Sequence, residues 1–96
     1  MKLIYLNKEL DNSKEHEIFA DRSLGYKVTV TFKPGNFADT IFNNCTEIHY
    51  KYKEFNYNKS NRIAFESNIH NTGCTQSIND IESIIIEEAT KKEKEF

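Results

Sequence analysis

Residues 25–33 constrain the fold more than any other part of the chain, because their side chains alternate between apolar and polar without a break. The apolar residues are Tyr26, Val28, Val30 and Phe32. They alternate with the polar residues Lys27, Thr29, Thr31 and Lys33. Successive side chains of a β-strand point to opposite faces. The pattern therefore predicts a strand with one buried and one solvated face, which Pro34-Gly35 ends.

Four further segments have weaker strand patterns, namely residues 2–8, 15–20, 46–54 and 62–69. In 46–54 the apolar side chains are Ile48, Tyr50 and Tyr52, and the polar side chains on the other face are Glu47, His49, Lys51 and Lys53. An asparagine-rich turn, residues 55–61, separates the last two segments. Asparagine tolerates the left-handed conformations that turns require, so a hairpin is predicted there.

Two segments have helical spacing. Asn36 is a candidate N-cap for a short helix over residues 36–43, in which Phe37 and Ile41 lie four residues apart. Residues 72–75 are expected to form a loop. From Ile78, apolar residues recur near the helical period and predict a long helix to about residue 93. We therefore expect a single α+β domain over residues 1–96, in the order β-β-β-α-β-β-α. Its antiparallel sheet of four to five strands has one face covered by the C-terminal helix.

A sheet covered on one face leaves its other face in water. That face would carry Lys27, Lys33, Lys51 and Lys53, and the hairpin tip beside it would carry Phe55 and Tyr57. Exposed aromatic side chains are frequent anchors of protein interfaces. We therefore expect a small protein-interaction module, an inhibitor or immunity-type protein of a phage or mobile element, that occupies a surface of a larger protein. An exposed sheet edge makes a homodimer a further expectation.

Nucleic-acid binding is the alternative function. The same lysines could contact phosphates, as basic sheet platforms do when they hold single strands. Such platforms also present aromatic rings on which bases stack. Here the strand aromatics Tyr26, Phe32, Tyr50 and Tyr52 are expected on the opposite, buried face. The formal net charge of −2 does not favour this alternative either.

Two cysteines and two histidines have mirrored spacings that suggest a zinc site, Cys45-x-x-x-His49 and His70-x-x-x-Cys74. The alternatives are inert thiols, a Cys45–Cys74 disulfide, and a thiolate–imidazole nucleophile that uses Cys74 just before the predicted helix. The CxxC pair usual in zinc sites is absent from the sequence. We expect no metal, no other cofactor and no enzymatic activity.

The N-terminal apolar run, residues 3–6, is too short for the core of an export signal. No stretch approaches the roughly 18 apolar residues that a membrane span needs. These features predict a cytoplasmic protein that does not contact membranes, with its cysteines kept as thiols.

Overall fold

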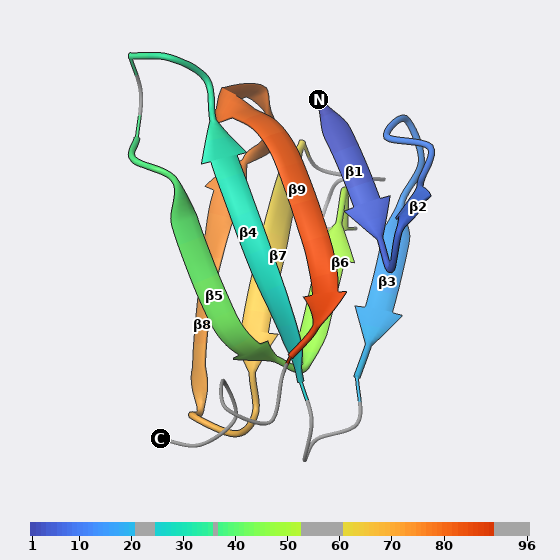
Figure 1. The fold of residues 1–96 in the computed structure, drawn as a ribbon, viewed down its shortest axis with the longest axis vertical. Helices are drawn as coiled ribbons and strands as arrows, with labels where there is room; N and C mark the ends of the chain where they lie inside the picture. The colour runs from blue at the N-terminus through green and yellow to red at the C-terminus, as the bar shows by residue number, and fades with distance from the viewer. Residues whose placement is uncertain (21–24, 36, 53–60, 90–96) are drawn as a thin grey trace.

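The computed structural model describes residues 1–20, 25–35, 37–52 and 61–89, which form two β-sheets packed face to face (Figure 1). Sheet A contains, in spatial order, β2 (Lys8–Glu9), β1 (Lys2–Tyr5), β9 (Ile81–Glu88), β4 (Tyr26–Phe32) and β5 (Thr40–Cys45). Sheet B contains β3 (His16–Phe19), β6 (Glu47–Tyr50), β7 (Arg62–Ser67) and β8 (Thr72–Ser77). The described helical structure is one short turn, η1 (Ile78–Asp80).

Five of the predicted strands are confirmed. Residues 25–33 contain β4, and the other four predicted segments contain β1, β3, β6 and β7. The antiparallel pairing of β6 with β7 is confirmed, whereas the predicted turn between them lies, except for Asn61, outside the described residues. The first segment ends earlier than expected because Leu6 and Asn7 have φ of 48° and 68°. Two consecutive residues with positive φ form a tight hairpin turn, which brings β2 back against β1.

The predicted C-terminal helix is wrong, and with it the α+β fold. Residues 81–88 form strand β9, which lies between β1 and β4 in sheet A. The pairing of β9 with β4 shifts register between Thr31 and Phe32, so that Ile81 and Ser83 oppose neighbouring residues. This bulge puts Ile81 and Ile84 on the same buried face although they are three residues apart. A spacing of three residues between apolar side chains is also typical of a helix. The bulge therefore explains why the sequence of β9 matched the helical period.

Two more predictions are corrected. The short helix expected over 36–43 is replaced by strand β5, which pairs with β4 in a hairpin. The residues that suggested the helix, Phe37 and Ile41, are exposed. The loop expected at Thr72–Thr75 belongs to strand β8, which pairs with β7 along its whole length. β8 carries few apolar side chains, so its strand character comes from backbone pairing and not from a periodic pattern.

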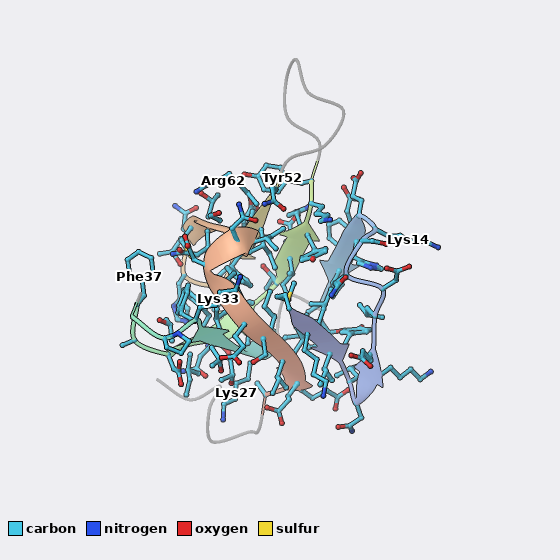
Figure 2. All side chains as sticks on the ribbon, turned by 90° about the horizontal axis from the view of Figure 1, so that it is seen from above. Lys14, Lys27, Lys33, Phe37, Tyr52 and Arg62 are labelled. Atoms are coloured by element: carbon cyan, nitrogen blue, oxygen red, sulfur yellow. The ribbon has the colours of Figure 1, made fainter. Side chains whose placement is uncertain are left out.

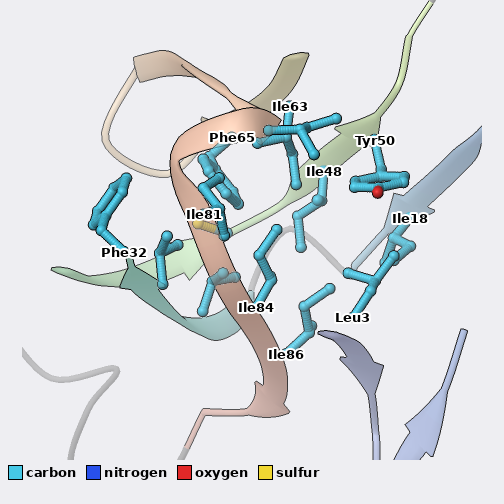
Figure 3. Close-up of a cluster of buried hydrophobic side chains, with 14 residues drawn as sticks. Leu3, Ile18, Phe32, Ile48, Tyr50, Ile63, Phe65, Ile81, Ile84 and Ile86 are labelled. Carbon is cyan, nitrogen blue, oxygen red and sulfur yellow. The ribbon is translucent and has the colours of Figure 1, made fainter. Parts of the chain in front are cut away.

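The hydrophobic core lies between the two sheets (Figure 3). Sheet A contributes Val28, Val30, Ile84 and Ile86, which are fully buried. Sheet B contributes Ile48, Tyr50, Ile63 and Phe65. Burying one such aliphatic or aromatic side chain stabilises the fold by about 1.5–3 kcal/mol. The inward face predicted for β4 is therefore confirmed, but a second sheet covers it in place of a helix.

Two sheets give the molecule two outer faces, and these faces lie on opposite sides of the core. Lys27 is on the outer face of sheet A, and Arg62 is on the outer face of sheet B (Figure 2). The predicted single basic face assumed that β4 and β6 share a sheet. They belong to different sheets, so the polar residues of the two strands are separated by the core.

Candidate functional site

The outer face of sheet A carries a line of β-branched side chains that crosses four strands. Ile4 of β1 is in register with Ile85 of β9, which pairs with Thr29 of β4, which pairs with Ile41 of β5. We call these four residues the isoleucine row. Their neighbours along each strand, such as Leu3, Ile84 and Val30, point into the core. The row therefore points away from the core, where strand positions of a sandwich are usually polar.

The isoleucine row is apolar at its centre and charged at its margins. Ile41 is 55% exposed, and the other three side chains are half-buried against one another and their neighbours. Lys2 lies on one side of the row, while Lys27 lies on the other in register with Glu87. Beyond Ile41, the β4–β5 connection presents Phe37, which is 63% exposed and whose ring packs edge-on against the buried Phe32 at 5.4 Å (Figure 2).

The predicted contact lysines that the structure describes, Lys27, Lys33 and Lys51, are distributed over both sheets. Lys33 is exposed just after β4, where its backbone N–H donates to the Asp80 carbonyl at 3.0 Å. Lys51 follows β6 in the other sheet with φ of 53°, and its N–H donates to the Arg62 carbonyl. Lys53, Phe55 and Tyr57 lie outside the described residues. Of the predicted lysines that the structure describes (Lys27, Lys33 and Lys51), Lys27 is the one that lies beside the isoleucine row.

The cysteines and histidines of the predicted zinc site are not brought together. Cys45 and Cys74 face a cavity of about 280 Å³ between β5 and β8, which lie on the same side of the sandwich (Figure 1). His49 lies on the outer face of sheet B. His70 is exposed, and its Nε2 accepts a hydrogen bond from Asn44 Nδ2 at 3.2 Å. Neither histidine therefore joins the two thiols in a common set of metal ligands.

Both cysteines are free thiols with weak nucleophilic character. Burial, together with the neighbouring Cys74 sulfur, raises the pKa of Cys45 to about 12. Burial also raises the pKa of Cys74. The predicted helix whose dipole would lower the pKa of Cys74 is replaced by η1 and β9. Thiols with raised pKa values remain protonated at neutral pH, as expected of inert buried cysteines.

The outer face of sheet B carries a different set of potential ligands, Glu47, His49 and Glu66. Their carboxylate oxygens and imidazole nitrogens lie within 4.8 Å of one another. Among the described residues (1–20, 25–35, 37–52 and 61–89), no other group of three or more histidine, cysteine, aspartate or glutamate side chains lies this close together. Glu47 and His49 are two residues apart on a predicted strand, so their shared face could be read from the sequence. Glu66 joins them only through the hairpin register.

The comparisons with known proteins give no relationship. No family model, curated protein or solved structure matches this chain. Within the part of the chain that the structure describes, no helix combines the length and the apolar character needed to cross a membrane. The functional interpretation therefore depends on the geometry of the two outer faces.

Proposed function

We propose that this chain is a protein-binding module that acts by covering a surface of a larger protein through the outer face of sheet A. The isoleucine row is the observation that carries this proposal. An apolar line bordered by charged side chains matches the usual anatomy of an interface, with an apolar core and a polar rim. An inhibitor or immunity-type protein of a phage or mobile element remains the expected class, without enzymatic activity of its own.

The four strands present only part of the area that one partner in a stable complex buries. The row is roughly 14 Å long, because neighbouring strands lie about 4.8 Å apart. Four strands of the length of β4 cover roughly 450 Å². One partner in a stable complex buries about 800 Å². The remaining contact area would come from residues beside these four strands, and Phe55 and Tyr57 remain predicted contacts.

Nucleic-acid binding has no comparable support. The proposed platform required Lys27 and Lys51 on one face, but Lys27 is in β4 of sheet A and Lys51 directly follows β6 of sheet B. The outer face of sheet B, which His49 occupies, also carries Glu17, Glu47 and Glu66. Carboxylates at these positions repel phosphates.

Site-specific photocrosslinking in a lysate of the source organism tests the proposed surface. A benzophenone amino acid replaces Ile41 on the proposed face, and a matched variant carries it at the exposed Thr75 of β8, on the opposite outer face. We expect one protein to crosslink through position 41 and not through position 75. Unlabelled wild-type chain should compete for that protein, and Ile85→Lys should compete at least tenfold less well.

Equal crosslinking from both positions would contradict the proposal, as would full competition by Ile85→Lys. A nuclease-sensitive crosslinked product at position 41 would replace it with nucleic-acid binding. Thermal unfolding of Ile85→Lys provides the control for folding, because Ile85 points away from the core and its substitution should leave the fold intact.

A further inference from the structure

The outer face of sheet B has an arrangement that the proposed protein contact does not use. Glu47 and His49 project from β6, and Glu66 lies directly opposite Glu47 on β7. We propose that Glu47, His49 and Glu66, here called the Glu–His–Glu cluster, bind a divalent first-row transition-metal ion. The proposal is independent of the isoleucine row, because the two features lie on opposite outer faces.

The spacing of the ligand atoms fits a metal of this kind. His49 Nε2 and Glu47 Oε1 are 3.5 Å apart. A tetrahedral ion with bonds of about 2.1 Å separates its ligands by about 3.4 Å. The third ligand atom, from Glu66, lies within 4.8 Å of both. Closing the site would bring the Glu66 oxygen at most about 1.4 Å nearer to the other two ligand atoms.

The charges around the cluster favour a bound cation. Glu47 and Glu66 are cross-strand partners, and like charges directly opposite each other destabilise a sheet. Glu17 approaches from β3, where its Oε1 lies 3.8 Å from His49 Nδ1. A cavity above β6 and β7 is lined by Glu15, Glu17, His49, Tyr52, Ala64, Glu66 and Thr75. None of these lining residues is a lysine or arginine, although Arg62 Nη2 donates a hydrogen bond to Thr75 Oγ1 at 2.9 Å. The lining carboxylates outnumber this one guanidinium, so a divalent ion would neutralise the remaining negative charge.

The surroundings hold the ligands in place and leave room for the ion. Asn68 Nδ2 donates to Glu47 Oε2 at 3.0 Å, which leaves Oε1 directed at His49. Phe19 packs edge-on against the His49 ring at 5.7 Å. The side chains of Glu47 and His49 are only 25% and 20% exposed. Ala64, the cross-strand partner of His49, is small and leaves space above the sheet. Partners that orient ligands in this way are typical of metal sites.

One imidazole and two carboxylates form a nitrogen and oxygen set. Imidazole suits zinc and its first-row neighbours, whereas magnesium and calcium prefer oxygen ligands alone. Three protein ligands leave at least one coordination position open to water or another ligand, and the cavity above the cluster provides access to it. Zn²⁺ is therefore a suitable probe.

Isothermal titration of the metal-free full-length protein with Zn²⁺ tests the site. We expect about one equivalent to bind, and His49→Ala and Glu66→Gln each to weaken binding at least tenfold. Asn68→Ala should weaken it about tenfold, because it removes the donor that orients Glu47. Glu82→Gln, an exposed glutamate of sheet A, is the matched control and should bind as wild type does.

The thiols could also bind zinc, so Cys74→Ala separates the two possibilities. Unchanged affinity in Cys74→Ala, together with the losses in His49→Ala and Glu66→Gln, supports the proposal. Loss of binding in Cys74→Ala would assign the zinc to the cysteine pair and overturn it. Wild-type affinity in His49→Ala, or no binding by the wild type at millimolar Zn²⁺, would also overturn it. Circular dichroism of each variant verifies that the sheets are formed.

Discussion

The adjacent residues Ile84 and Ile85 provide a direct test of strand β9. Ile84 points into the core and is 0% exposed, with buried Leu3 and Val30 in register on either side. Ile85 points outward between Ile4 and Thr29. Substituting each by alanine removes the same atoms from neighbouring positions of one strand. The two variants therefore differ in burial and very little in strand propensity.

The expected losses of stability differ several-fold. Ile84→Ala removes the branched side chain and leaves a cavity between large neighbours that cannot collapse into it, which costs about 3–4 kcal/mol. Ile85→Ala leaves no cavity, because the site is open to solvent. It loses only part of the burial free energy, about 1 kcal/mol. The difference of about 2–3 kcal/mol corresponds to roughly 10–20 °C in melting temperature for a chain of this size.

Urea unfolding, followed by circular dichroism, measures both variants. The slope with denaturant should stay at the wild-type value, so that the midpoints report stability. A helix over 78–93 would place Ile85 on the same buried stripe as Ile81 and Ala89, and would make Ile85→Ala the more damaging change. Equal losses, or a larger loss for Ile85→Ala, would refute the strand and its register.

Two further predictions follow from the described contacts. Gly25→Ala should cost more than 2 kcal/mol in urea unfolding, because φ is +65° and the added Cβ would lie 2.6 Å from the Asn44 Cα. Gly35→Ala should cost only about 1 kcal/mol, since φ is +86° but no atom lies near its Cβ; equal costs would show that the close approach at Asn44 is incorrect. Above about pH 8.5 an unfolded cysteine loses its proton, whereas folded Cys45, with its pKa raised to about 12, keeps it. The free energy of unfolding should therefore fall as pH rises from 8.5, by up to about 1.4 kcal/mol per pH unit. Cys45→Ala should show a shallower fall in the same titration, and an identical slope would show that Cys45 is not the group responsible.

Strands with alternating side chains were predictable because one face of each strand is buried. β4 is the clearest case, and its buried Val28 and Val30 are the residues that the pattern selected. β9 was not predictable in this way. Its bulge changes the side-chain period, and three consecutive isoleucines match a helical stripe as well as a strand. β-branching favours a strand, but periodicity was the stronger apparent signal.

Predicting the candidate sites required knowledge of the strand order even more than predicting the fold did. Ile4 and Ile41 are far apart in the sequence, and only the register of four strands places them in one row. Glu47 and His49 were correctly predicted to share a face, because the β6 alternation is regular. Their third partner, Glu66, required the exact pairing of β6 with β7. The residue patterns predicted which side chains share a face of one strand. Only the strand pairings determined which side chains of different strands lie next to one another.

The parallel pairing of β1 with β9 has a consequence for biosynthesis. β9 separates β1 from β4 in sheet A, and it comes after every other described strand in the chain. On the ribosome, β1 and β4 are therefore made long before the strand that joins them. Until β9 emerges from the exit tunnel, both strands have an unpaired edge that can bind another nascent chain. We expect sheet A to form only after synthesis of β9. Until then, we expect chaperones to cover the unpaired edges of β1 and β4.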